Sequence, residues 1–262
     1  MPEAAIATVA WLSTAPVKGL ALLDHEAAML GPAGLEGDRR FHLIDETGRL
    51  VNGKRLGTLV QVAADYDPAS STLELRFPDG DVVAAEVAFA GPVETGFYGT
   101  FRLGRMVVGP WSEALSEFAG VALRLVATDK DGAGIDRDRH AAVSLLSTAS
   151  VAKLAEVFGL PEVDRRRFRM GVGIDGVGAH SEDEWFGRRV RIGEAVVTPH
   201  AHVGRCLVTR QNPDSGEPDL DTLGAIKHYR GEIESDEPIP FGVQARVAEP
   251  GMVRVGDTIV VE

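Results

Sequence analysis

Leu73-Glu-Leu-Arg-Phe77-Pro-Asp-Gly80 contains the pattern that decides the fold class. Apolar and charged side chains alternate over residues 73–77, which is typical of a strand with one buried face. Pro78-Asp-Gly80 follows with residues that favour a tight turn between two strands. A β-hairpin is therefore predicted here, and much of the chain repeats the same arrangement of short strand and turn.

Short apolar or alternating runs bounded by turn residues recur along the chain. They predict strands over residues 4–12, 41–45, 102–108, 121–128, 189–192, 195–198 and 253–261. Asp45-Glu-Thr-Gly48 is a second candidate hairpin turn. Strands do not alternate with long helices, which argues against a doubly wound sheet. We predict a strand-dominated α+β protein with barrel-like sheets.

Few helices interrupt these strands. The strongest helical pattern covers residues 148–158, with Ser147 as the N-cap and Gly159 at the end. A short helix is predicted over residues 111–118 and a weaker one over 221–227. The Gly-, Asp- and Arg-rich segment 126–142 is the best candidate for a long loop or a junction between domains.

The composition is that of a soluble globular protein. The 262 residues are 44% hydrophobic and 25% charged, and the net charge of −12 is shared equally by the two halves of the chain. An acidic surface argues against nucleic-acid or anionic-membrane partners, but a pocket can still gather a few cations around a small anion.

Cellular location is constrained by two features. A single cysteine excludes an internal disulfide and fits a reducing compartment. The apolar run 4–12 is too short to cross a bilayer, and no basic segment precedes it as in a signal peptide. We therefore expect a cytoplasmic protein.

The single cysteine, Cys206, ends the segment His200-Ala-His-Val-Gly-Arg-Cys206. A thiolate suits metal binding or nucleophilic chemistry, whereas most unpaired cysteines are small buried hydrophobes. If one strand continued through this segment, His200, His202 and Cys206 would share a face and form a zinc or copper site. Gly204 would break that alternation, and the histidines would then be solvated residues at a strand end.

Several cations and one helix start could together hold an anion. Lys18 and Arg39 lie in separate turn-rich segments, and residues 165–169 contain four arginines. Ser147 and Thr148 begin the strongest helix, where free N–H groups and the helix dipole favour a phosphate. The alternative is a set of solvated arginines and an ordinary helix cap. Dinucleotide, phosphate-loop, nucleophile-elbow and paired-cysteine zinc motifs are all absent from the sequence.

The order of the motifs resembles that of the MOSC proteins, which are named for the C-terminal domain of molybdenum cofactor sulfurases and include the amidoxime-reducing components. The similar segments are Ala15-Pro-Val-Lys18, Gly34-Leu-Glu-Gly-Asp-Arg-Arg-Phe41, Leu145-Leu-Ser-Thr-Ala-Ser150, Arg167-Phe-Arg169, Arg205-Cys206-Leu-Val-Thr209, Asn212-Pro-Asp-Ser-Gly-Glu217 and the stretch from Phe241 to Asp257. The resemblance implies an N-terminal β-barrel module over residues 1–125 and a β-barrel-like MOSC domain over residues 126–262.

The same resemblance implies a function. The matching cysteine of cofactor-binding members is a molybdenum ligand, so Cys206 would be the catalytic thiolate of a molybdenum cofactor (molybdopterin) enzyme. Its cofactor contacts would be Lys18, Arg39, Ser147, Thr148, Arg169 and Thr209. The expected reaction is reduction of an N-oxygenated small molecule, with electrons from a separate donor protein.

This chain departs from the family pattern around the expected site. Met170-Gly171 replaces a Pro-Asn pair, and Gly19, Arg210 and Asn212 also differ from the usual residues. Two other functions therefore remain open. Cys206 could carry a persulfide in sulfur transfer, with His202 or Arg205 favouring the thiolate, or the chain could be a non-catalytic cofactor-binding or carrier module.

Overall fold

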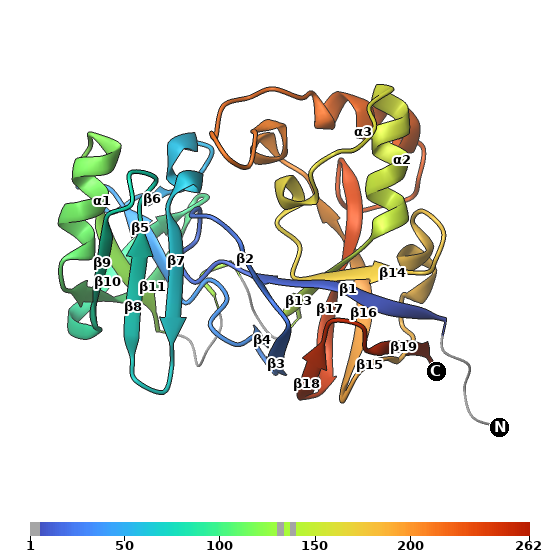
Figure 1. The fold of residues 1–262 in the computed structure, drawn as a ribbon, viewed down its shortest axis with the longest axis horizontal. Coiled ribbons are helices and arrows are strands. Elements are labelled where there is room, and N and C mark those ends of the chain that lie inside the picture. Colours follow the sequence, from blue (N-terminus) through green and yellow to red (C-terminus); the bar gives the residue numbers. More distant parts are fainter. Residues whose placement is uncertain (1–5, 130–133, 137–139) are drawn as a thin grey trace.

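Two strand-rich bodies lie side by side in the computed structural model, which describes residues 6–129, 134–136 and 140–262. Figure 1 shows β5 to β11 with α1 in the left body, and β13 to β19 with α2 and α3 in the right body. Strands dominate both bodies, as the sequence predicts. Within these described ranges, no helix combines the length and apolarity needed to cross a bilayer.

The right body is a closed barrel of seven strands. β1 closes it by pairing antiparallel with β14 on one side and β19 on the other. The interior is filled by aliphatic side chains from every strand, because each contributes inward-facing β-branched or leucine residues. In spatial order the strands are β14 (Val172–Asp175), β13 (Val143–Ser147), β17 (Pro240–Glu249), β16 (Ala195–Gly204), β15 (Val190–Ile192), β19 (Thr258–Val261) and β1 (Ala7–Thr14).

In the described part of the chain, the left body contains two antiparallel sheets and one α-helix. Trp111 at the start of α1 (Trp111–Ala119) is fully buried, and its indole N–H donates to the carbonyl oxygen of Leu73 at 3.0 Å. One sheet is β10 (Ala88–Phe97), β11 (Thr100–Val108), β12 (Arg124–Thr128), β5 (Phe41–Ile44) and β6 (Leu50–Val51). The other is β7 (Ala63–Asp67), β8 (Thr72–Arg76) and β9 (Val82–Glu86).

The stretch that predicted a hairpin forms one. Leu73 and Leu75 are fully buried, whereas Arg76 is exposed, as alternation requires. Gly80 has a φ of 98° and donates to the carbonyl oxygen of Phe77 at 3.1 Å, which turns the chain from β8 into β9. The Asp45–Gly48 turn between β5 and β6 closes in the same way.

Helix α2 (Thr148–Phe158) confirms the predicted caps. The Ser147 hydroxyl accepts from the Ser150 N–H, and Gly159 ends the helix with a φ of 67°. α3 (Thr222–Arg230) begins one residue later and ends three residues later than predicted. Among the described residues there are also four short 3₁₀ helices: η1 (Gly57–Gln61), η2 (Arg165–Phe168), η3 (Ser181–Trp185) and η4 (Leu207–Arg210).

The predicted strand over residues 253–261 is wrong in one respect, because it is two strands. β18 (Gly251–Arg254) pairs with β3 (Ala27–Gly31), which in turn pairs with β4 (Gly34–Leu35). A turn at Gly256, whose φ is 86°, separates β18 from β19. The apolar run alone contains no signal for this break except the glycine.

In two places, strands pair across the predicted domain boundary. β1 lies within residues 1–125 but belongs to the right-hand barrel, and β2 (Leu23–His25) extends from it. β12 continues to Thr128 and pairs with β5 and β11 of the left body. Of the predicted junction 126–142, residues 130–133 and 137–139 lie outside the described residues. The domain boundary after residue 125 remains a prediction from the sequence.

The Asn212–Gly216 turn joins the two bodies. Gln61 of η1 donates its side-chain N–H to the carbonyl oxygen of Ser215 at 3.0 Å. The backbones of Gly57 and Gly216 approach so closely that a Cβ on Gly57 would lie 2.3 Å from the Gly216 oxygen. Glycine is required at this contact because any side chain would push the two bodies apart.

Candidate functional site

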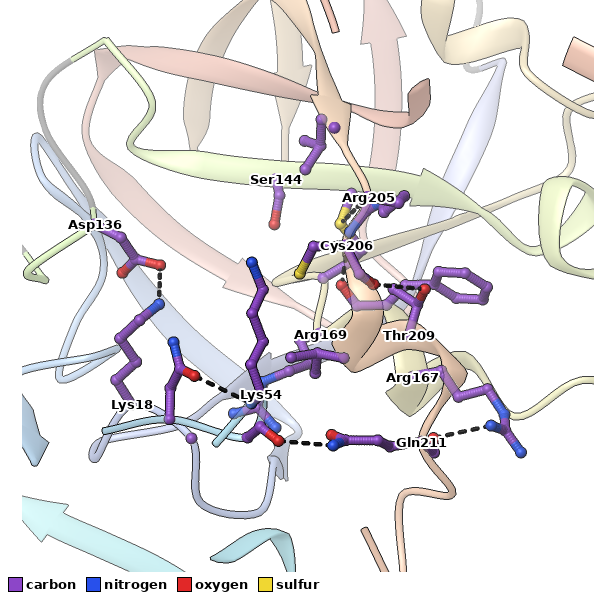
Figure 2. Close-up of a pocket in the computed structure, with 18 of the residues that line it drawn as sticks. Lys18, Lys54, Asp136, Ser144, Arg167, Arg169, Arg205, Cys206, Thr209 and Gln211 are labelled. Atoms are coloured by element: carbon purple, nitrogen blue, oxygen red, sulfur yellow. Dashed lines mark hydrogen bonds and ion pairs between the residues drawn. The ribbon is translucent and has the colours of Figure 1, made fainter. Parts of the chain in front are cut away.

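A cavity of about 200 Å³ is lined by residues of both bodies and contains Cys206 (Figure 2). Lys18, Arg39, Arg169 and Thr209 also line it. Five of the seven residues predicted as site residues are thus brought together from four separate segments of the sequence. The convergence of one thiol and several cations makes this cavity the candidate functional site.

Cys206 is a free, partly exposed thiol immediately before η4. Its carbonyl oxygen accepts the Thr209 N–H at 3.0 Å and the Thr209 hydroxyl at 3.1 Å. The same hydroxyl lies 2.7 Å from that of Thr222. Thr209 therefore fixes the backbone that presents the thiol to the cavity.

Lys18 and Arg39 each lie beside a carboxylate. The Lys18 ammonium forms an ion pair with Asp136, and the Arg39 guanidinium pairs with Asp38 at 2.5 Å. Arg39 is also 3.8 Å from Asp136. Its pKa is raised, since attraction by these two carboxylates outweighs the opposing effect of burial. The two cations are thus held in place before any ligand arrives.

Arg169 differs from Lys18 and Arg39 because no carboxylate among the described residues lies within ion-pairing distance of its guanidinium. Its guanidinium donates to the carbonyl oxygen of Leu20 at 2.8 Å. Burial, followed by repulsion from Arg39, lowers its pKa to about 10. A positive charge held at this electrostatic disadvantage gains most from an added anion.

Both arginines have a strained backbone. Arg39 has a φ of 53° and Arg169 a φ of 52°, which place two non-glycine residues in the left-handed region. Each such residue costs on the order of 1 kcal/mol. Strain of this kind persists where the surrounding structure fixes a side chain for a purpose, and here both side chains line one cavity.

The structure does not bring Ser147 and Thr148 to this cavity. The Ser147 N–H donates to the buried carboxylate of Glu182 at 3.1 Å, and the Thr148 hydroxyl donates to Asp175 at 2.6 Å. The start of α2 is thus occupied by carboxylates of the protein itself. Burial raises the pKa of Glu182. Ser144, also on β13, lines the cavity instead.

The metal site of His200, His202 and Cys206, which required one regular strand through this segment, does not form. Among the described residues no group of three or more His, Cys, Asp or Glu side chains is placed to hold a metal ion. β16 has three register irregularities between Val196 and Gly204, so the assumed alternation fails. His202 is not solvated either: it is buried, with Nδ1 3.0 Å from the Ser235 hydroxyl and Nε2 3.4 Å from Asp183.

Arg205 and Met170 shape the wall beside Cys206. Arg205 donates to the carbonyl oxygens of Phe241 and, at 2.9 Å, Phe168. Met170 is buried and lines the cavity where the family pattern has a proline. Gly171, in place of the asparagine, donates its N–H to the Ser144 hydroxyl at 3.1 Å.

Sequence reasoning missed the contribution of the left body. Asn52 and Lys54, which follow β6, and Tyr98, in the turn between β10 and β11, line the cavity. None of these residues lies in a recognisable motif. Gln211 also lines the cavity and donates to the carbonyl oxygen of Gly53 at 2.6 Å, across the two bodies.

Models of two known families match this chain. A model of the MOSC domain matches residues 121–260, more than half of the chain. The chain belongs to the MOSC family. A model of the MOSC N-terminal beta barrel domain matches residues 6–98 of this MOSC protein. The family that its motifs resemble is thereby confirmed.

Several known proteins are similar to this MOSC protein. Mitochondrial amidoxime-reducing component 1 of Xenopus laevis is 25% identical over 287 residues, covering 97% of this chain and 82% of that protein. Molybdenum cofactor sulfurase of Oryza sativa subsp. japonica is 38% identical over 77 residues, which cover 27% of this chain and 9% of that protein. A crystal structure of the YUAD protein from Bacillus subtilis has a TM-score of 0.49 and 15% identity, covering 97% of this chain and 94% of that one.

Proposed function

We propose that this MOSC protein is a molybdenum-cofactor-dependent oxidoreductase that reduces N-oxygenated small molecules. The observation that carries the proposal is the meeting of the lone thiol of Cys206 with Lys18, Arg39 and Arg169 in one cavity. The similarity to a protein named for amidoxime reduction supports the reaction class. The single cysteine favours a reducing compartment, and we place the protein in the cytoplasm.

The residues fit this cofactor. A metal held by protein side chains alone needs three or four ligands, and the described part of the chain contains no such group. A metal that arrives with a dithiolene requires only one thiolate from the protein, which Cys206 supplies. The cofactor's phosphate and pterin require cations and hydrogen-bond donors, which the same cavity contains.

The chain's own residues would perform three tasks. Cys206 would hold the metal, with its backbone fixed by Thr209. Lys18, Arg39 and Arg169 would neutralise the phosphate. When bound, the cofactor supplies a two-electron redox couple. Reduction of an amidoxime consumes two electrons and two protons and releases an amidine and water, so a separate donor protein would deliver the electrons.

The proposal is tested by expressing wild type and Cys206→Ser in a molybdenum-replete host. Molybdenum is measured by elemental analysis and pterin by fluorescence after oxidation. X-ray absorption counts the sulfur ligands of the metal, and benzamidoxime reduction is measured with an artificial electron donor. Wild type should contain molybdenum and pterin and reduce benzamidoxime. Cys206→Ser should lose one sulfur ligand and the activity.

Wild-type protein without molybdenum and without pterin would overturn the proposal. If both proteins contain the cofactor with the same number of sulfur ligands, Cys206 is not the metal ligand. Lys153→Met is a suitable control, because Lys153 is exposed on α2 and pairs with Glu156. It should match wild type in every measurement.

A second candidate function is sulfur transfer. It is favoured by the partly exposed thiol of Cys206 and by the similarity to a protein named as a molybdenum cofactor sulfurase. Mass spectrometry of the intact protein after incubation with a persulfide donor distinguishes the two functions. A labile added sulfur that Cys206→Ser does not acquire would support sulfur transfer.

A further inference from the structure

The left body supplies a wall of the cavity that differs in chemistry from the barrel side. We call Asn52, Lys54 and Tyr98 the rim site. Lys54 and Tyr98 are exposed, whereas the cations assigned to the cofactor, Lys18 and Arg39, are largely covered. The rim site therefore lies where a ligand enters from solvent.

Asn52 fixes the other two residues of the rim site. Its buried side-chain oxygen accepts the Lys54 backbone N–H at 3.0 Å, and its side-chain N–H donates to the Tyr98 hydroxyl at 2.8 Å. One buried amide thus orients both residues. Tyr98 has a φ of 46° because Tyr98 and Gly99, whose φ is 84°, form the two-residue turn between β10 and β11, and its side chain is 63% exposed. The turn thus presents the Tyr98 ring to solvent beside Lys54.

Lys54 is the accessible positive charge of the cavity. Lys18, Arg39 and Arg167 each form an ion pair with an aspartate. Among the described residues Lys54 forms no ion pair, and its ammonium lies 5.3 Å from the centre of the Tyr98 ring. Figure 2 shows its side chain extending into the cavity toward Ser144 and Cys206.

We propose that the rim site selects substrates that carry an anionic group on a planar ring. The Lys54 ammonium would pair with the anionic group, and the exposed Tyr98 ring would stack on the planar part. The substrate class within the proposed function is then an aromatic N-oxygenated acid. The reaction rests on the proposed function, whereas the binding preference does not.

The test compares three probes of matched shape. Benzamidoxime is neutral, its 4-carboxy derivative is anionic, and its 4-aminomethyl derivative is cationic. Calorimetry gives their dissociation constants for the full-length wild type, Lys54→Met, Lys54→Arg and the control Lys153→Met. Molybdenum and pterin contents are measured for every preparation.

Wild type should bind the anionic probe about fivefold to tenfold more tightly than the neutral one. The cationic probe should bind most weakly. Lys54→Met should abolish the preference, whereas Lys54→Arg and Lys153→Met should retain it. Tyr98→Ala should weaken the binding of all three probes, because the stacking surface is removed.

Three results would overturn the rim site: no anion preference in wild type, an unchanged preference in Lys54→Met, or loss of pterin from Lys54→Met, which would assign Lys54 to the cofactor. The two proposals fail separately. A Lys54-dependent preference in a protein without molybdenum refutes only the proposed function. Amidoxime reduction without an anion preference refutes only the rim site.

Discussion

The Arg39 guanidinium donates to the backbone carbonyl oxygen of Arg169 at 3.2 Å, and both residues have a left-handed backbone. Arg39 precedes β5 of the left body, whereas Arg169 follows η2 beside the barrel. This bond therefore joins the two bodies at the cavity and places two guanidinium groups close together. Such a pair is electrostatically unfavourable until an anion lies between the charges.

Substitution of Arg169 should separate stability from anion binding. Arg169→Gly removes both the backbone strain and the disfavoured charge, whereas Arg169→Ala removes only the charge. The Gly variant should be more stable than the Ala variant by about 1 kcal/mol in denaturant unfolding. Both should bind inorganic phosphate more weakly than wild type. Equal stability of the two variants would show that the left-handed backbone stores no strain.

Asp136 competes with any anion for Lys18 and Arg39, so Asp136→Asn should strengthen anion binding. One removed negative charge should raise the affinity for inorganic phosphate by about threefold to fivefold, as measured by calorimetry. Asp214→Asn is the matched control, because Asp214 pairs with Arg166 at an exposed position. An increase of the same size in the control would mean that only the net charge of the protein matters.

Gly173 on β14 faces Trp11 of β1, and a Cβ at this position would lie 2.0 Å from the indole ring. The ring is largely buried and cannot move without disturbing the closure of the barrel. Gly173→Ala should therefore lower the free energy of unfolding by about 1–3 kcal/mol. Gly91→Ala, where a Cβ meets no atom within 4 Å, should change it by less than about 0.5 kcal/mol.

Two histidines with lowered pKa values, the buried His42 and the partly exposed His180, should make the fold acid-sensitive. Burial lowers the pKa of His42 to about 3 and that of His180 to about 4, both from 6.5. A depressed pKa contributes stability that is present above pH 6.5 and is lost as the pH falls toward the folded value. For the buried His42 the loss is about 1.4 kcal/mol per pH unit within this window, and for the partly exposed His180 it is smaller.

His42→Gln tests this expectation. The amide can keep a hydrogen bond to Thr95, which lies 2.8 Å from the imidazole Nε2. Urea unfolding at pH 7, 6 and 5 should show a smaller pH dependence for the variant than for wild type. Identical slopes would mean that His42 does not titrate on unfolding in this range.

The local pattern predicted the local structure well. The alternation in β8, the hairpin turns and both caps of α2 follow from residues that are neighbours in the sequence. The pattern failed where distant packing decides. The run 253–261 is divided because its two halves pair with different partners, β18 with β3 and β19 with β1 and β15. The bulges of β16 likewise removed the parity on which the histidine site depended.

The candidate site was predictable only in part. Cys206, Lys18, Arg39, Arg169 and Thr209 lie in motifs shared with a family, which is why their convergence was expected. Ser147 and Thr148 had the right chemistry, but the start of α2 meets Glu182 and Asp175 instead. Lys54 and Tyr98 lie in no motif. An exposed lysine and an exposed tyrosine can be assigned to a site only when the folded structure shows which cavity they line.

The position of β1 determines when the cavity can exist. β1 is synthesised well before its partners β14 and β19, which come much later in the chain. Until those strands are made, β1 can pair only with β2. The barrel, and with it the cavity beside Cys206, closes only after β19 has emerged. Any ligand that needs the closed barrel is therefore acquired after β19 has been synthesised, and any proteolytic cut that releases β1 would open the barrel at two strand edges.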